Sequence, residues 1–335
     1  MERLVELAER LGLSNYEAKV YVALLVYGPL SSTELAEKSE VPQPRIYDVA
    51  KSLMDKGLIM VQHGRPKKFS AVNPSVALRN YVQRRYESQL QALEELLGSV
   101  PEEAVEDEVG LWISRGYESM ANLIEDSVRS AKVELLLAVP SRMARKLVPL
   151  IRESISTCAV LFDSEELVED VLSKFDEVRL RPTKAPIMVM PDFSYMLVVV
   201  EWDGERPVAY KVTDKNLVKM LAVYYLNYLR GEGEAISVKF RQLKRRAYVH
   251  LTRALDHLRQ VEGEVMVTVK GSWVRSREPV MLRGKLVRIS ENLLRSMGSL
   301  VLRLEDGREV TVGGIGAHLE DIEAREILIE VEAPT

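Results

Sequence analysis

The chain has 335 residues, of which 47% are hydrophobic and 29% are charged, and its formal net charge is −4. This composition is typical of a globular protein with roughly two or three domains, and it excludes a disordered chain or a protein that coats nucleic acid everywhere. Cys158 is the only cysteine, which excludes disulfides within the chain and a cysteine-rich metal site. The amphipathic N-terminus and the lack of an apolar run near about 18 residues indicate no signal peptide or membrane span, so we expect a cytoplasmic protein.

The first 30 residues predict two helices. Apolar residues recur at helical spacing on both sides of a break at residues 12–15. Ser14 and Glu17 form a capping box for the second helix, and Gly28-Pro29 ends it. These helices are expected to complete the core of the domain that follows.

Residues 32–54 predict a helix-turn-helix. Ser32 and Thr33 can cap a short helix that closes before Val41. Pro42 and Pro44 fit only the first turn of the next helix. From residue 45 on, apolar residues at helical spacing leave a polar outer face, which consists of Gln43, Arg45, Tyr47, Asp48 and Lys51. This second helix is the candidate for reading DNA.

Residues 58–72 predict a basic two-stranded wing. Gly57 ends the preceding helix, and strands at 58–61 and 68–72 are joined by a loop that carries Arg65 and Lys67, with Lys68 after it. Residues 41–70 contain six Lys or Arg and two Asp, so this segment is positively charged within an acidic chain. A protein-binding module with solvated charges is the alternative.

These motifs occur as a spaced set: Ile46-Tyr47-Asp48-Val49, Lys56-Gly57-Leu58, Gly64-Arg65-Pro66-Lys67-Lys68-Phe69 and Ala71-Val72-Asn73-Pro74. The set resembles the N-terminal domain of the TrmB family of archaeal sugar-responsive transcriptional regulators. The resemblance implies a homodimer on a palindromic operator in double-stranded DNA, with no cofactor and no membrane partner. The residues expected at the DNA are Ser32, Thr33, Gln43, Pro44, Arg45, Tyr47, Lys51, Arg65, Lys67 and Lys68. Arg65, Lys67 and Lys68 would hold phosphate or the minor groove.

Residues 75–99 predict one helix with an apolar stripe at Leu78, Val82, Tyr86, Leu90, Leu93 and Leu97. The mean spacing of the stripe exceeds that of a heptad, so the stripe drifts around the helix and favours a short two-helix contact over a long coiled coil. We therefore predict a dimer contact here. The alternative is that the helix packs back on its own domain. The acidic run at 101–108 marks a solvated boundary.

Beyond residue 109 the pattern changes to alternating strands and helices, which predicts an α/β domain with a largely parallel sheet. Strands are expected at 111–113, 133–139, 159–162, 178–181, 187–190 and 195–201, and helices at 117–130, 142–155, 164–174 and 215–230. The segment resembles the phospholipase D-like half of the TrmB effector domain. The His-x-Lys-x-x-x-x-Asp motif of active phospholipase D-like enzymes is absent, because Leu251 and Thr252 follow His250. We expect a binding module rather than an enzyme, with a phosphodiesterase as a minor alternative.

Residues 237–259 are strongly basic and allow two interpretations. The run contacts DNA, or it is the solvated face of a connecting element, and the second interpretation is favoured. From residue 263 the pattern is that of a small β domain, with strands at 265–269, 280–289, 299–304, 308–312 and 327–331 and a turn at Asp306-Gly307.

The glycine-rich run that begins Gly313-Gly314-Ile315-Gly316 and continues to Glu320-Asp321 is the strongest ligand candidate. Glycines let the backbone approach a ligand closely, and a carboxylate can accept hydrogen bonds from adjacent hydroxyls. The run resembles the C-terminal signature of the TrmB effector domain, which implies sugar contacts at Gly314 and Glu320, with Gly313 and Ser299 beside them. The alternative is a structural turn with Glu320 and Asp321 capping a helix. Trp202 and Trp273 are stacking platforms or, more simply, core residues.

The sequence thus predicts a multidomain α+β protein. Its parts are a winged helix-turn-helix at 1–75, a helical dimerisation linker at 76–108, an α/β phospholipase D-like subdomain at 109–236, and a basic connector with a C-terminal β subdomain at 237–335. The predicted function is a regulator of sugar transport or metabolism genes whose operator affinity responds to a sugar. The alternative is a constitutive or architectural DNA-binding protein without ligand sensing. No cofactor, catalytic residue or metal site is expected.

Overall fold

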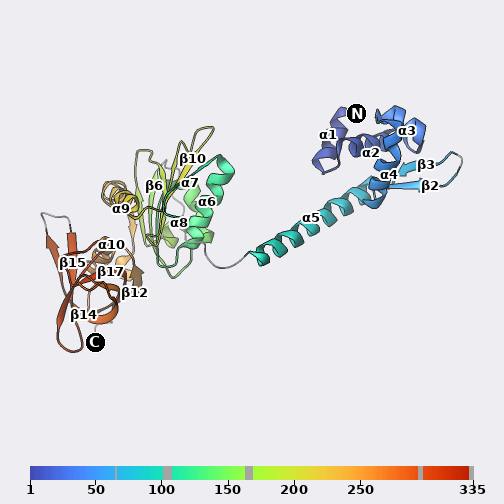
Figure 1. Ribbon diagram of the computed structural model, residues 1–335. Helices are drawn as coiled ribbons and strands as arrows, with labels where there is room; N and C mark the ends of the chain where they lie inside the picture. The colour runs from blue at the N-terminus through green and yellow to red at the C-terminus, as the bar shows by residue number, and fades with distance from the viewer. Residues whose placement is uncertain (65, 101–107, 163–168, 293–296, 332–335) are drawn as a thin grey trace. The chain divides into compact units, whose positions relative to one another are not determined.

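The computed structural model describes residues 1–64, 66–100, 108–162, 169–292 and 297–331 (Figure 1). Backbone contacts divide the chain into two compact units, residues 1–105 and residues 106–335.

The first unit is a winged helix. Its helices are α1 (Glu2–Arg10), α2 (Asn15–Tyr27), α3 (Ser32–Ser39) and α4 (Gln43–Asp55). Its small sheet has the order β1-β3-β2, formed by β1 (Leu30–Ser31), β2 (Ile59–Gln62) and β3 (Lys68–Ala71). The helices and both wing strands lie where the sequence predicts them. Leu35, Ile46, Leu53 and Phe69 are buried from solvent and join α3, α4 and the wing in one core.

The cap of α3 differs from the prediction. Ser31, rather than Ser32 or Thr33, is the N-cap, and its Oγ accepts the backbone N–H of Glu34 at 3.4 Å. The Glu34 carboxylate accepts the backbone N–H of Ser31 at 2.8 Å, which completes a capping box. Because Ser31 takes the capping role, the side chains of Ser32 and Thr33 are free to contact α4.

Helix α5 (Pro74–Ser99) begins on the winged helix and then leaves it. Ala77 and Tyr81 are buried, and the Tyr81 hydroxyl donates to the carbonyl of Gly12 at 3.3 Å. From residue 82 to residue 100 every side chain is exposed. The N-terminal end therefore packs on its own domain, while most of the apolar stripe does not.

The second unit contains an eight-stranded sheet with the order β11-β7-β6-β5-β8-β9-β10-β4. The strands are β4 (Leu111–Arg115), β5 (Glu134–Pro140), β6 (Ser156–Phe162), β7 (Glu177–Leu180), β8 (Ile187–Pro191), β9 (Met196–Val200), β10 (Val208–Val212) and β11 (Glu234–Val238). The associated helices are α6 (Tyr117–Ser130), α7 (Ser141–Leu147), α8 (Glu169–Lys174) and α9 (Lys215–Val223). A π-helix (Tyr224–Arg230) extends α9, and the Tyr225 hydroxyl within it donates to the carbonyls of Leu137 and Cys158.

The prediction of a largely parallel sheet is wrong. Among the residues that the structure describes, β5–β6 and β6–β7 pair in parallel, and the other pairings of this sheet are antiparallel. The connections from β8 to β9 and from β9 to β10 are too short for a helical crossover, so these three strands form antiparallel hairpins. The helix predicted at 142–155 is also too long. Pro149 lacks the backbone donor that an α-helix needs, and α7 passes into a 3-10 turn (Val148–Leu150).

The rest of the second unit is a six-stranded sheet with one short helix. Its order is β12-β17-β13-β14-β15-β16, and its strands are β12 (Arg245–Tyr248), β13 (Val265–Trp273), β14 (Pro279–Asn292), β15 (Met297–Arg303), β16 (Glu309–Gly313) and β17 (Ile322–Val331). Helix α10 (Leu251–Leu258) lies beside β15 and β17 (Figure 1). The Asp306-Gly307 turn is present as predicted, with Gly307 at φ 85°.

Candidate functional site

One edge of α4 forms a polar surface with α3. The Gln43 amide donates to Thr33 Oγ1 at 3.4 Å, and the Tyr47 hydroxyl donates to Ser32 Oγ at 3.4 Å. Lys51 lies one turn beyond Tyr47 and is exposed. Five of the residues predicted at the DNA thus form one continuous surface over two helices.

The wing meets this surface at Tyr47. The Tyr47 ring packs edge-on against Phe69, with ring centroids 6.2 Å apart, and the Lys67 ammonium lies 6.0 Å from the Tyr47 ring. Tyr47 is still 53% exposed, so its outer edge is available to a partner. Lys68 is exposed in β3, whereas Arg65 lies outside the described residues.

Arg45 lies on the other flank of α4. Two residues on a helix are separated by about 200°, so Arg45 and Tyr47 point in different directions. Arg45 shares a shallow depression with Ser14 and Tyr16 at the start of α2. Pro44 is exposed in the first turn. The predicted DNA-binding set therefore divides into a main surface beside the wing and a separate position at Arg45.

A buried carboxylate fixes α4 against α2. Glu17 accepts hydrogen bonds from Ser52 Oγ at 2.6 Å, from the backbone N–H of Ser14 at 2.8 Å, and from the Lys56 ammonium. Burial by itself would raise the pKa of Glu17, but these donors and the charge of Lys56 lower it to about 2. The sequence revealed Glu17 only as a capping residue. Its second role requires Ser52 and Lys56 to come close in the fold.

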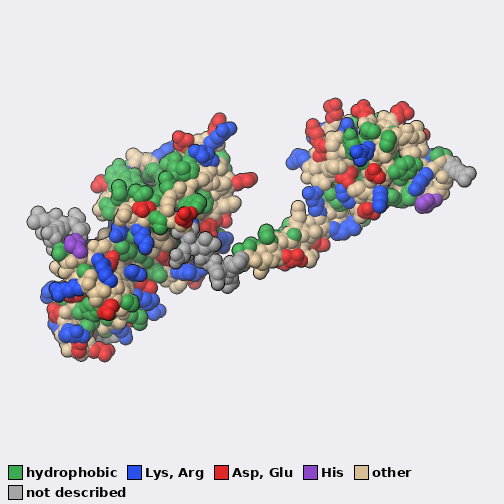
Figure 2. Space-filling model, in the orientation of Figure 1, with side chains coloured by type: hydrophobic (Ala, Val, Ile, Leu, Met, Phe, Trp, Pro, Cys, Tyr) green, Lys and Arg blue, Asp and Glu red, His purple; other side chains and the backbone are tan. Residues whose placement is uncertain are grey.

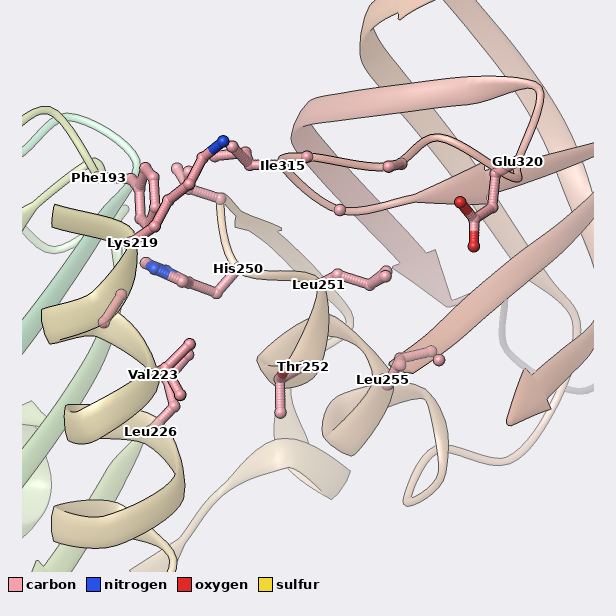
Figure 3. A pocket seen from close by; sticks show the side chains of 16 residues that line it. Phe193, Lys219, Val223, Leu226, His250, Leu251, Thr252, Leu255, Ile315 and Glu320 are labelled. Carbon is pink, nitrogen blue, oxygen red and sulfur yellow. The ribbon is translucent and has the colours of Figure 1, made fainter. Parts of the chain in front are cut away.

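A cavity of about 360 Å³ lies between the two sheets of the second unit. Helix α9 lies on one side and α10 with the glycine-rich loop on the other (Figure 3). Gly314 and Glu320, two of the four predicted ligand residues, line it. Gly313 does not line it but lies against Glu320, whose Oε2 is 2.8 Å from where a Cβ on Gly313 would stand. Ser299 is in β15 next to the lining residue Gly298 and is not itself part of the lining.

The turn containing Glu320 and Asp321 does not cap a helix, so the helix-capping part of the structural alternative is wrong. Strand β17 begins at Ile322 directly after it. The Asp321 carboxylate instead accepts the backbone N–H and the hydroxyl of Thr311, both at 2.8 Å. This carboxylate fixes the return of the loop, whereas no hydrogen bond is recorded for Glu320 within the described residues.

The basic run at 237–259 is not simply a solvated face, because part of it is buried. Arg253 is fully buried, and its guanidinium donates to Glu134 Oε1 at 2.9 Å, Ser156 Oγ at 2.7 Å and the carbonyl of Thr157 at 2.9 Å. Its Nε lies 3.5 Å from Glu177. Glu134, Ser156 and Glu177 are the first residues of β5, β6 and β7. Arg253 therefore joins α10 to the beginning of three neighbouring strands.

Further ion pairs surround this contact. Arg230 binds Glu177 at 2.9 Å and Asp256 at 2.6 Å, and Arg246 binds Asp176 at 2.9 Å. Burial alone would raise the pKa of Glu177, but the arginine charges lower it to about 2. The two sheets are thus connected by a buried network of paired charges.

His250 belongs to both the network and the cavity. Its Nδ1 lies 2.8 Å from Glu134 Oε2, and its backbone N–H donates to the same oxygen at 2.8 Å. Burial alone would raise the pKa of Glu134, but His250 and Arg253 lower it to about 2, so the carboxylate is ionised. An ionised carboxylate can only accept hydrogen bonds, so His250 must donate to it. The ring proton of His250 is therefore assigned to Nδ1.

Trp202 and Trp273 belong to the core, which is the simpler of the two interpretations of the sequence. Trp202 is 6% exposed, and its indole N–H donates to the carbonyl of Ala185 at 2.9 Å. Trp273 packs partly buried against the core of the six-stranded sheet. Neither ring lines the cavity.

Comparison with known proteins agrees with this architecture. Residues 7–75 match the family model described as sugar-specific transcriptional regulator TrmB. Residues 110–237 and 243–332 match the models for the N-terminal and C-terminal subdomains of the TrmB effector-binding domain. The chain belongs to the TrmB family. This confirms the resemblance carried by the winged-helix motifs.

Relatives of the chain in the TrmB family include two proteins of Pyrococcus furiosus. The HTH-type sugar sensing transcriptional regulator TrmBL1 is 24% identical over 98% of both chains. The putative HTH-type transcriptional regulator TrmBL2 is 37% identical over 41% of this chain and 57% of its own length. A solved structure of TrmBL2, described as an archaeal chromatin protein with a novel mode of DNA binding, has a TM-score of 0.43 at 26% identity and covers 70% of this chain and 99% of that one. Within the described part of the present chain, no helix is long and apolar enough to cross a membrane.

Proposed function

We propose that this member of the TrmB family is a DNA-binding transcriptional regulator whose operator affinity is controlled by a small molecule bound in the second unit. The observation that carries the first part is the continuous polar surface formed by α3, α4 and the wing. Family membership and the description of TrmBL1 as a sugar sensing regulator support the second part.

The edge of α4 beside the wing is the proposed reading surface. Gln43, Tyr47 and Lys51 recur every four residues along this edge, so they follow one line when the helix enters the major groove. Ser32 and Thr33 hold the first two of these side chains through the 3.4 Å hydrogen bonds. Lys67, Lys68 and Arg65 are proposed to contact phosphates. Arg45 would contact the backbone or a base on the opposite flank.

The free part of α5 is the proposed dimer contact. Tyr86 is 57% exposed, Leu90 39%, Leu93 48% and Leu97 63%, although all four are large and apolar. The space-filling view shows hydrophobic side chains on this helix (Figure 2). A second α5 would cover the stripe, and two winged helices would then occupy the two halves of a palindrome.

The cavity between the two sheets is the proposed effector site. A sugar is the ligand class suggested by the family. Gly314 and Glu320, which line the cavity, would contact it, and Gly313 lets the Glu320 carboxylate lie close to the backbone. We also propose that the α/β part has a phospholipase D-like fold without enzymatic activity. The four domains are proposed to have the boundaries expected from the sequence. A constitutive or architectural DNA-binding protein without ligand sensing is the second candidate.

Footprinting of the purified chain on DNA upstream of its own gene tests the proposal. A protected palindrome that changes on adding a small molecule supports a regulator. Protection along the DNA without a boundary, unaffected by any effector, favours the architectural candidate. No binding to specific or random DNA at low salt would refute both.

A further inference from the structure

The edge strand β4 exposes apolar side chains on both faces of the eight-stranded sheet. Among the described residues it pairs only with β10, and Leu111 is 52% exposed, Trp112 50% and Ile113 52%. Successive side chains of a strand point to opposite faces, so both sides of this edge are apolar. Edges of natural sheets usually carry charges, prolines or bulges that prevent association. The opposite edge follows this rule, because a register shift between Ala235 and Ser237 interrupts the pairing of β11.

The outer backbone groups of β4 are identified by its contacts with β10. At one end the backbone N–H of Gly116 donates to the carbonyl of Pro207 at 3.0 Å, and at the other end the N–H of Thr213 donates to the carbonyl of Gly110 at 3.0 Å. Backbone groups of successive residues point alternately to the two sides of a strand, so the even-numbered residues of β4 face β10. The other residues direct their N–H and carbonyl groups away from the sheet, and these residues are Leu111, Ile113 and Arg115. The strand thus offers an open row of backbone donors and acceptors.

The open row is complementary to a second copy of itself. If two β4 strands run antiparallel with Ile113 opposite the partner's Ile113, then Leu111 lies opposite the partner's Arg115. All three outward residues of each strand then form hydrogen-bonded pairs. One two-fold axis relates the two strands, as in the commonest closed dimers. The side-chain row formed by Val198, Tyr210 and Ile113 would continue into the same row of the second copy.

The size of the α5 contact favours a second copy over another partner. Stable interfaces bury roughly 1,200–2,000 Å² and involve about 20–30 residues from each chain. The exposed stripe of α5 from Val82 to Leu97 supplies far fewer residues, so a dimer held by α5 needs a further contact. Strand β4 begins at Leu111, shortly after α5 ends at Ser99. A dimer formed through α5 therefore holds two copies of β4 at a high effective concentration.

We propose that β4 pairs antiparallel with β4 of a second copy and joins two eight-stranded sheets at one edge. The proposal rests on the dimer proposed from α5 and adds a contact in the second unit. One short strand from each chain is too small an interface to hold a dimer by itself, so both contacts are required.

Sedimentation of the full chain over a range of concentrations tests the strand pairing. Ile113→Lys places two like charges opposite each other at the centre of the pair and should raise the dimer dissociation constant by roughly tenfold or more. Ile236→Lys makes the same change in the opposite edge strand β11, where the isoleucine is 36% exposed, and should leave the constant nearly unchanged. Circular dichroism checks that both variants retain the fold. An unchanged constant in Ile113→Lys would overturn the proposal.

Cysteine cross-linking tests the register without adding a charge. The native Cys158 is buried, so it should not react. Ile113→Cys stands opposite its own copy and should form a covalent dimer under mild oxidation. Leu111→Cys is displaced from its own copy by four residues, roughly 13 Å along the strand, and should not cross-link by itself. The double change of Leu111→Cys with Arg115→Cys should restore the cross-link.

The outcomes separate the strand pairing from the proposed function. A dimer in which Ile113→Cys does not cross-link, or in which Leu111→Cys cross-links equally well, would overturn the strand pairing and leave the α5 contact in place. A monomer at every concentration would overturn both contacts. These measurements involve neither DNA nor a small molecule, so the reading surface and the effector cavity are tested separately by footprinting.

Discussion

Replacing Arg253 with methionine provides the sharpest test of how the second unit is held together. Methionine keeps an unbranched side chain in the same space but removes the buried charge, three hydrogen bonds and the ion pair with Glu177. Removing one partner of a buried ion pair costs about 3–5 kcal/mol. Glu134 keeps His250 and two backbone donors, and Glu177 keeps Arg230, so we expect about 3 kcal/mol, at the lower end.

Guanidinium unfolding followed by tryptophan fluorescence measures this loss selectively. The three tryptophans, Trp112, Trp202 and Trp273, all belong to the second unit, so the signal does not report the winged helix. Arg245→Met is the matched control, because Arg245 is paired with Glu330 but its side chain is 71% exposed. An exposed pair contributes about 0–1 kcal/mol, so the control should leave the midpoint nearly unchanged.

Equal and small losses of unfolding free energy in Arg253→Met and Arg245→Met would contradict a stabilising role for the buried Arg253. A double-mutant cycle with Glu134→Gln isolates the pair itself. The two changes together should cost less than the sum of the single changes by about 0.5–3 kcal/mol, because the second removes a charge that the first leaves unpaired. Additive losses would show that the 2.9 Å contact between Arg253 and Glu134 does not stabilise the fold as an ion pair.

Three further predictions concern the first unit. Gln43→Ala should relax sequence preference by roughly 1–3 kcal/mol at one base pair, whereas Lys68→Ala should weaken binding to all sequences and reduce the salt dependence of binding. Titrations of specific and random DNA measure both effects. Equal effects of the two substitutions would contradict the assigned roles. Glu17→Gln should cost roughly 2–3 kcal/mol at neutral pH. Because the folded pKa of Glu17 is lowered from 4.5 to about 2, this stabilisation is present above pH 4.5 and is lost as the pH falls through 2, so circular dichroism should show the two proteins converging in acid. Leu93→Glu should convert the dimer into monomers in sedimentation experiments. The control Ser88→Glu, on the opposite face of α5, should leave the dimer intact. A dimer that persists in Leu93→Glu would place the interface elsewhere.

Local patterns in the sequence were sufficient to predict the helices and strands of the winged helix. The Pro42 and Pro44 pair, the Gly57 stop and the alternation in the wing each depend on neighbours within a few residues, and the structure has the predicted elements there. The capping residue of α3 was misplaced by one position because Ser31, Ser32 and Thr33 all carry a suitable hydroxyl. Only the reciprocal bond with Glu34 distinguishes Ser31.

The second unit could not be predicted as well, because its order depends on distant contacts. The strand β10 (Val208–Val212) was missed although its sequence alternates, and the direction of β8 and β9 follows from short connections that periodicity does not reveal. The charge pattern of 237–259 was misleading for a related reason. A basic run is solvated unless acidic partners approach it, and the partners of Arg253 and Arg246 are about 70 to 120 residues earlier in the chain.

The buried network limits how a ligand in the cavity can act. A hinge motion that separated the two sheets would break the contacts of Arg253, at a cost of about 3–5 kcal/mol. This cost sets the population of the separated state, so a ligand could favour separation only through a differential affinity that exceeds it. Residues 314–317 and Glu320 of the glycine-rich loop, with Lys219 and Val223 of α9, lie outside the network and line the same cavity. A response to an effector should therefore pass through the ordering of this loop and α9, while the two sheets remain one body.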